Sequence, residues 1–254
     1  MEIKEYVGET LTDRKFDKLM VAFLLDEPFF ASIIMNLKKV KTYDIPTAGV
    51  TVRNNSFVLY WNPDFVSKLP KIKLFGLMKH ECYHLIYQHV VARKQDPHTL
   101  WNIATDLAIN SLISQRYLPD GGLVPGKRLK KETSKGMTKE GIDRHDKMSN
   151  FLAGLPMYKS SEWYMEKLKD DKEASDAFES AFGDAAGVGF DVHLDRDGSL
   201  SESDMKIMKG KLKDIIRKSA SERSKKLKSR ELLEELIENI LMFIQAQKLK
   251  EQLV

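Results

Sequence analysis

The chain has 254 residues, of which 42% are hydrophobic and 31% are charged, and its formal net charge is a mild +4. This composition excludes a disordered or fibrous chain and is typical of a globular protein with one large domain, or with a domain of about 150 to 200 residues and an appended tail. The polar first ten residues, the lack of any stretch of transmembrane length and the single cysteine together lead us to expect a cytoplasmic protein without a membrane segment or an internal disulfide.

The first part of the chain predicts two helices followed by a β-hairpin. Residues 11–38 show helical periodicity, and Pro28 is expected to divide them. Residues 49–62 contain two runs rich in Val, Phe, Tyr and Trp around Asn54 and Asn55, which is a strong hairpin signal. The pattern indicates a small β element within a helical protein.

The middle of the chain predicts two apolar helices and then a loop region. Helical sequence runs from residue 63 to about residue 94, with Pro70 as a candidate break, and residues 100–115 read as a second strongly apolar helix. Residues 117–160 are rich in Gly, Pro and Lys, which predicts a long loop region of the kind that often forms a lid or a binding surface. The predicted fold class is α+β and mostly helical, with a small hairpin or sheet.

The C-terminal residues predict a helical tail with two different surfaces. Residues 206–231 carry eleven Lys or Arg against three acids, a net charge of +8. The end of the tail has one apolar stripe that must pack on the domain or on a partner chain, formed by Leu232, Leu236, Ile240 and Phe243. We therefore predict a domain at 1–205 and a tail at 206–254 that is a candidate surface for a protein partner or for self-association. Binding of nucleic acid is a weaker expectation, because the basic segment lacks aromatic residues for base stacking.

The sequence HECYH at residues 80–84 predicts a metal site. His80 and His84 are four residues apart, about 40° around a helix, so both imidazoles can bind one ion. In metal-dependent hydrolases such a pair holds zinc, the zinc acidifies a bound water, and the intervening glutamate accepts the proton of that water. The flanking apolar residues indicate a buried helix, in which three polar groups are costly unless a ligand satisfies them. We predict Zn²⁺ at His80 and His84, with Glu81 as general base.

A third protein ligand is expected from another part of the chain. His89 is five residues beyond His84, about 140° around the helix, which predicts a helix-end or packing role for it. Asn102, Asp106 and Asn110 form a polar stripe along the next apolar helix. Asp106 is the leading candidate for the third ligand, and the two asparagines are candidates for groups that orient the ligands.

A second candidate for completing the site lies in the sequence FDVHLD. His193 is an alternative third ligand, or it could stabilise the developing oxyanion, a role that Tyr164 could also fill. Asp191 is a candidate for a supporting group beside it. Cys82 is about 200° around the helix from His80, which predicts a small core residue instead of a zinc ligand.

These elements, in this order, resemble the "putative metallopeptidase domain" family of bacteria and phages, which is often fused to a von Willebrand factor A-like domain. The segments that carry the resemblance are KHECYHLIYQH, WNIATDLAINSLI, SEWYMEKL and FDVHLD. The resemblance covers roughly residues 10–205. It implies a zincin-like α+β domain whose active-site helix holds zinc through His80 and His84, with Asp106 as third ligand, Glu81 as base and a peptide or protein as substrate. The chain departs from the family pattern by its basic and then amphipathic tail.

Two functional hypotheses follow. In the first, the protein is a zinc metallopeptidase whose hairpin offers an edge strand to an extended substrate and whose 117–160 loop covers the cleft. In the second, it is a non-catalytic module that zinc stabilises and that binds partners through the tail, with a link to nucleic acid resting only on the basic segment.

Overall fold

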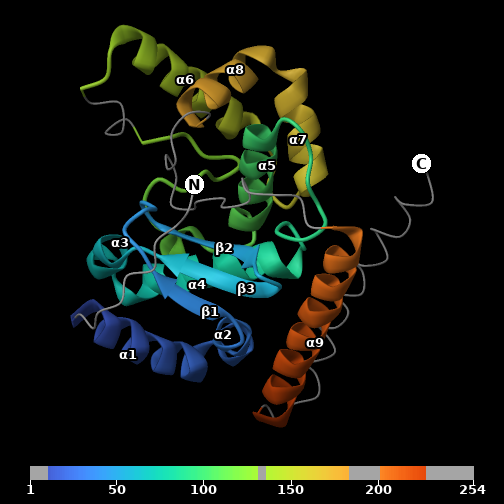
Figure 1. The fold of residues 1–254 in the computed structure, drawn as a ribbon. Coiled ribbons are helices and arrows are strands. Elements are labelled where there is room, and N and C mark those ends of the chain that lie inside the picture. The colour runs from blue at the N-terminus through green and yellow to red at the C-terminus, as the bar shows by residue number, and fades with distance from the viewer. Residues whose placement is uncertain (1–10, 131–135, 183–200, 227–254) are drawn as a thin grey trace.

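A computed structural model describes residues 11–130, 136–182 and 201–226. These residues are mostly helical and include one three-stranded sheet, in agreement with the predicted α+β class (Figure 1). Asp191, His193 and the apolar stripe of the last predicted helix lie outside the described residues. No helix within the described ranges has the length and apolarity needed to cross a bilayer.

Two helices open the described chain, as the sequence predicts. Helix α1 spans Leu11–Asp26, and α2 spans Pro28–Met35. Pro28 occupies the first turn of α2, where its missing N–H needs no intrahelical partner. Six consecutive residues of α2, from Phe29 to Ile34, are buried, so this short helix forms the centre of the N-terminal core.

The sheet contains the predicted hairpin and one strand that the sequence did not predict. Strands β2 (Ala48–Arg53) and β3 (Ser56–Trp61) pair antiparallel, and Asn54 and Asn55 between them have φ values of 48° and 56°. Two consecutive residues in this left-handed region suit a two-residue hairpin turn. Strand β1 (Lys38–Lys41) pairs parallel with β3, giving the order β1-β3-β2. Its sequence, KKVK, is too short and too charged to predict a strand.

The helical stretch after the hairpin is divided near Pro70, as expected, but ends earlier than predicted. Helix α3 (Pro63–Lys68) is capped by the side chain of Asn62, and α4 spans Lys71–Ile86 with Pro70 immediately before it. The helix stops at Ile86, not at about residue 94, and Gln88 has a φ of 61°. This left-handed residue turns the chain away from the helix axis.

One glycine of α4 permits a close crossing of the chain. The short helix η1 (Gln115–Tyr117) passes over α4 at Gly76. A Cβ atom at position 76 would lie 1.9 Å from the carbonyl oxygen of Tyr117, far inside van der Waals contact. Only glycine therefore allows η1 to approach α4 this closely.

The predicted loop region at 117–160 is wrong in its second half, which contains a helix. Helix α6 spans Lys139–Gly154, and the hydroxyl of Thr138 caps it by accepting a hydrogen bond from the Gly141 amide (3.2 Å). Charged residues on its exposed side conceal a buried stripe of Gly141, His145, Met148, Ser149 and Leu152. The other helices of this half are α5 (His98–Asn110), α7 (Ser161–Asp170) and α8 (Lys172–Phe182).

The described part of the predicted tail packs on the N-terminal helices. Helix α9 spans Glu202–Lys226 and lies beside α2 (Figure 1). Met208 and Leu212 are buried in the same hydrophobic cluster as α2, and the hydroxyls of Ser219 and Ser32 are 3.0 Å apart. This stretch of the basic segment thus has one side in the core and the other side exposed.

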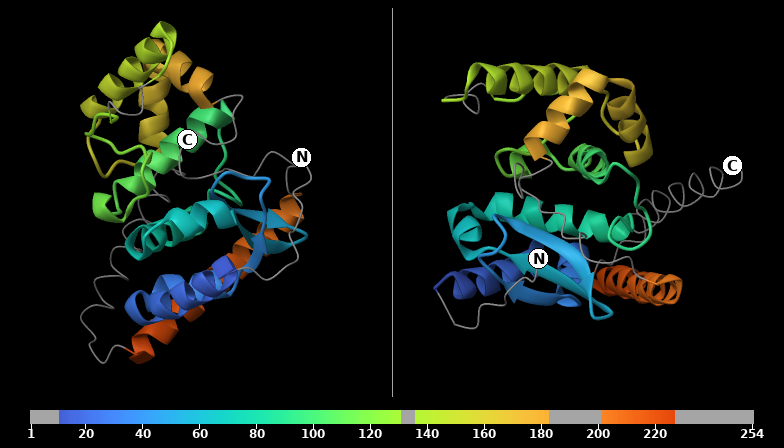
Figure 2. Two further views of the ribbon diagram at one scale, coloured as in Figure 1. Left: turned by 90° about the vertical axis from the view of Figure 1, so that its left-hand side faces the viewer. Right: turned by 45° about the horizontal axis from the view of Figure 1, so that its top comes forward.

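The core has two large hydrophobic clusters that meet at α5. The first cluster joins α1, α2, the sheet, α4 and α9, and the second joins α5 through α8. Helix α5 contributes to both, because Leu100 to Ala108 pack in the second cluster whereas Ile109 packs in the first. Helix α4 lies in the middle of the molecule, with α5 on one side and α1 on the other (Figure 2). The boundary between α4 and α5 is therefore the boundary between the two clusters.

Candidate metal centre

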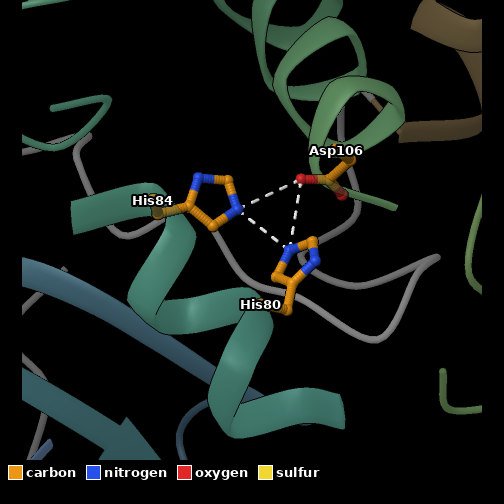
Figure 3. A group of neighbouring side chains, drawn as sticks. All are labelled: His80, His84 and Asp106. Atoms are coloured by element: carbon orange, nitrogen blue, oxygen red, sulfur yellow. Dashed lines mark hydrogen bonds and ion pairs between the residues drawn. The ribbon is translucent and has the colours of Figure 1, made fainter. Parts of the chain in front are cut away.

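Helix α4 presents two imidazoles at its boundary with α5. His80 and His84 project from the same side of the helix toward α5, and both are buried (Figure 3). Their Nε2 atoms are 2.9 Å apart. Two ring nitrogens at this distance, inside the fold, can share a proton or a cation.

Asp106 completes the group from α5. Its Oδ1 atom lies 3.5 Å from Nε2 of His80 and 3.4 Å from Nε2 of His84 (Figure 3). For metal–ligand bonds of about 2.0–2.1 Å, the corners of a tetrahedron around zinc are roughly 3.3 Å apart. The three donor atoms therefore have the spacing, and the chemical types, of three ligands to one zinc ion. No other such group of His, Cys, Asp or Glu occurs among the residues that the structure describes.

Asp106 is the most exposed member of the group. The side chains of His80 and His84 are 0% and 2% exposed, whereas that of Asp106 is 18% exposed. The carboxylate is therefore the ligand group through which the site comes nearest to solvent, and a catalytic zinc site needs a fourth position for a water molecule.

A hydrogen bond to the side chain of Asn110 in α5 determines the tautomer of His80. The side-chain Nδ2 of Asn110 donates to the carbonyl oxygen of Leu123 (2.8 Å), so its Oδ1 is the atom that faces Nδ1 of His80, at 2.9 Å. An amide oxygen only accepts, which places the proton of His80 on Nδ1 and leaves Nε2 with a lone pair toward Asp106 and His84. Asn110 therefore lies where an orienting group was predicted.

The other predicted orienting group is engaged elsewhere. The Nδ2 of Asn102 donates to Nδ1 of His98, 3.1 Å away on the same helix. The spacing of four residues in the sequence places Asn102 on the polar stripe, but His98, one turn earlier, engages its amide. The described contacts give Asn102 no link to the two histidines of α4.

His89 contacts the group directly, although its helical position predicts only a helix-end or packing role. Its Nδ1 lies 3.2 Å from Nδ1 of His84, and its Nε2 lies 3.3 Å from Oγ of Ser161 in α7. The predicted helix-end or packing role agrees with its place just past the end of α4 and with its burial, but the contact with His84 is additional, because the prediction extends the helix beyond Ile86. A left-handed Gln88 is not foreseeable from this sequence, since glutamine has no preference for that conformation.

Glu81 follows His80 in the sequence and is buried in the fold. Its side chain is 0% exposed. Burial, followed by the negative charge of Glu81, raises the pKa of the Cys82 thiol well above its usual range. A buried carboxylate is costly unless a positive charge compensates it, and a cation at the neighbouring His80, His84 and Asp106 would do so.

Two further residues considered from the sequence have structural roles. Cys82 is 0% exposed, and its thiol donates to the carbonyl oxygen of Phe30 (3.5 Å), which agrees with a core role. Tyr164 is fully buried in the second cluster, where its hydroxyl donates to the carbonyl oxygen of Pro156 (2.7 Å). That hydrogen bond commits the tyrosine to the core and away from a role as oxyanion stabiliser.

Comparison with known proteins identifies the family. Residues 13–248 match the model of a family described as "putative metallopeptidase domain". The chain belongs to this family. A metallopeptidase domain implies a metal ion and a peptide or protein substrate, and His80, His84 and Asp106 form the group in this member that can bind the ion. The family match also continues past residue 205, where the sequence predicts that a tail begins.

More distant similarity adds little to this assignment. An uncharacterized protein of Thermotoga maritima is 26% identical over 98 residues, which is 37% of this chain and 23% of that protein. The similarity thus spans less than a quarter of the relative's length. No solved structure gives a significant match to the metallopeptidase domain.

Proposed function

We propose that the protein is a zinc-dependent peptidase of the zincin-like type, in which His80, His84 and Asp106 hold the ion. The convergence of two Nε2 atoms and one carboxylate oxygen within 2.9–3.5 Å, at the edge of a buried helix, is the observation that carries this proposal. Two imidazoles and one carboxylate with an open fourth position form a donor set that suits catalytic zinc. Zinc bound there would acidify a water molecule and polarise a peptide carbonyl.

The remaining chemistry belongs to side chains of α4 and α5. In this proposal Glu81 accepts the proton of the attacking water and passes it to the leaving amine, as a general base and then a general acid. His80 and His84 stay neutral with their protons on Nδ1. Asp106 offsets part of the charge of the ion and is the most exposed of the three proposed ligands. His193 remains a predicted oxyanion stabiliser or alternative third ligand, and Asp191 remains a predicted supporting group beside it.

The sheet is the proposed binding element for the peptide chain. In the described sheet β2 is an edge strand, and it packs beside α4. An extended peptide that pairs with such an edge lies along a fixed line, with main-chain hydrogen bonds for affinity. We propose that β2 aligns the substrate beside the helix of His80 and His84.

Replacing Glu81 by Gln tests the mechanism. The variant removes the proton acceptor but keeps the size of the side chain, so we expect zinc to be retained and hydrolysis of a peptide library to fall by about 10² or more. Glu166→Gln, on the exposed side of α7, is the matched control and should leave both properties unchanged. Zinc content by elemental analysis and cleavage by mass spectrometry provide the two measurements. Wild-type cleavage rates in Glu81→Gln would exclude this mechanism.

The location of the group also favours a second function, a non-catalytic module that zinc stabilises. Two of the three candidate ligands, His80 and His84, come from α4, which packs in the first cluster. The third, Asp106, comes from α5, most of which packs in the second cluster. A metal in that place can hold the two clusters together without any turnover. This function predicts zinc in the purified protein and a lower melting temperature after chelation, with no cleavage of any peptide; protein free of zinc would exclude both functions.

A further inference from the structure

His89 occupies a defined place behind the candidate metal centre. Because Gln88 is left-handed, the chain folds back after α4, and the backbone amide of His89 donates to the carbonyl oxygen of His84 (2.9 Å). The side chain of His89 is thereby carried to the ring of His84, with ring centroids 5.3 Å apart and steeply inclined planes. It is 5% exposed and also packs edge-to-face against Trp101 of α5.

A metal ion bound at Nε2 of His84 determines which ring nitrogen of His84 and of His89 carries the proton. Nε2 of His84 is the atom that faces His80 and Asp106, so a metal bound there requires the proton of the neutral imidazole on Nδ1. Nδ1 of His84 lies 3.2 Å from Nδ1 of His89. The N–H of His84 must then donate, and Nδ1 of His89 must accept, which puts the proton of His89 on its Nε2.

The hydroxyl of Ser161 accepts the hydrogen bond from Nε2 of His89, at the end of this chain of contacts. Its Oγ lies 3.3 Å from Nε2 of His89, and the residue is 3% exposed at the start of α7. The N-cap of that helix is the neighbouring Ser160, so the hydroxyl of Ser161 is not required for capping. The direction of every hydrogen bond from His84 to Ser161 is consequently determined.

We propose that His89, held by Ser161, is a positioning residue for the metal centre, which fixes the tautomer and ring orientation of His84. The inference rests on the proposed metal site and adds to it a support that comes from α7. His80 obtains the equivalent support from Asn110, so the two histidines are oriented by different parts of the fold. Such supports commonly contribute about 10- to 100-fold to metal affinity.

Substitutions at position 89 separate this role from packing. His89→Phe keeps a ring of similar size but cannot accept the hydrogen bond, so we expect zinc affinity, measured by competition with a chromogenic chelator, to fall about 10- to 100-fold. His89→Asn places an amide oxygen near the position of Nδ1 and should restore most of the affinity. Ser161→Ala should give an intermediate loss. His145→Phe, at an equally buried histidine in α6, is the matched control and should bind zinc as the wild type does.

Cobalt provides a readout that packing alone would not change. With Co²⁺ in place of zinc, the visible absorption reports the geometry of the ligands, and we expect the spectrum of His89→Phe to differ from that of wild type while that of His145→Phe does not. Melting temperatures and circular dichroism establish that each variant is folded; if His89→Phe is not, the comparison of Ser161→Ala and His89→Asn with wild type decides.

The outcomes distinguish the inference from the proposed function. A wild-type protein that binds neither zinc nor cobalt overturns both. A wild-type protein that binds zinc, together with unchanged affinity and an unchanged cobalt spectrum in folded His89→Phe or Ser161→Ala, overturns the positioning role and leaves the proposed peptidase intact. Equal losses in His89→Phe and His89→Asn would also contradict it, because the restored acceptor would then have no effect.

Discussion

The two histidines of the proposed metal centre depend on residues of different kinds. His80 is held by an amide whose own orientation is fixed by a backbone carbonyl, so its support is a rigid part of α5 and the chain after it. His84 is held by another imidazole, which can accept or donate at either nitrogen. At the scale of single residues, Asn110 is therefore the support whose arrangement is determined without a bound metal, whereas that of His89 follows from the metal.

Replacing Asn110 by Ala should weaken both the fold and the metal site. The substitution leaves the buried carbonyl oxygen of Leu123 without its side-chain donor and frees the ring of His80, so we expect unfolding to become easier by about 1–3 kcal/mol and zinc affinity to fall about tenfold or more. Asn102→Ala on the same helix is the control, because that amide pairs with His98 and is less buried. Urea unfolding and chelator competition measure the two effects; equal zinc affinity in the two variants would argue against the role of Asn110.

Cys82 should be unreactive in the folded protein. Burial raises the pKa of its thiol well above the usual range, so at neutral pH the reactive thiolate is scarce, and the side chain is 0% exposed. We expect Ellman's reagent to react slowly with native protein and rapidly, with one thiol per chain, in denaturant. A native thiol that reacted as fast as free cysteine would contradict the burial of this face of α4.

At the scale of elements, α4 and its crossing by η1 determine where the histidines lie. The helix could be predicted because its apolar residues recur at helical intervals, and Asp106 could be predicted because a polar stripe on an apolar helix requires a partner. The contact of His89 could not, since it depends on the residue at which α4 ends. Helix α6 was hidden by its composition, and β1 by its brevity, because both are stabilised by packing against distant residues more than by local preference.

Gly76→Ala should destabilise the protein by about 3 kcal/mol, which is the upper end of the usual cost of overpacking. The new methyl group would meet the backbone of Tyr117, and α4 and η1 are both packed in place. Gly210→Ala is the opposite control: that glycine is exposed in the middle of α9, where a Cβ atom would meet nothing within 4 Å, and alanine there should stabilise the helix by about 0.5–1 kcal/mol. Chemical denaturation of both variants checks the signs; a neutral Gly76→Ala would show that η1 does not cross α4 so closely.

At the scale of the whole molecule, the candidate metal group joins two hydrophobic clusters. The histidines lie on α4, which packs in the first cluster, and Asp106 lies on α5, most of which packs in the second (Figures 1 and 3). The three residues could be predicted from the sequence but this division could not, because apolar residues recur along the whole of α5 and nothing in their pattern shows that its last turn packs in a different cluster.

Removal of the metal should therefore affect the entire fold. For free zinc at about 100 times its dissociation constant, binding stabilises the folded state by about 2.7 kcal/mol. In a chain of this size, chelation should lower the melting temperature by roughly 5–10 °C. Scanning calorimetry with and without a chelator measures this, and Asp106→Ala, which removes the ligand from α5, should melt at the same temperature in both conditions. An unchanged melting temperature in wild type would contradict a metal between the clusters.

If His80, His84 and Asp106 hold zinc as proposed, the affinity for zinc reports how well the two clusters are aligned, because these residues lie where the clusters meet. By thermodynamic reciprocity, whatever free energy zinc contributes to holding α5 against α4 is also the free energy by which a loosened interface weakens zinc binding. Substitutions deep in the α5–α7 packing, such as Leu168→Ala, should therefore release zinc more readily although they touch no ligand. If zinc binds there as proposed, loss of the ion would also weaken the contact between α4 and α5.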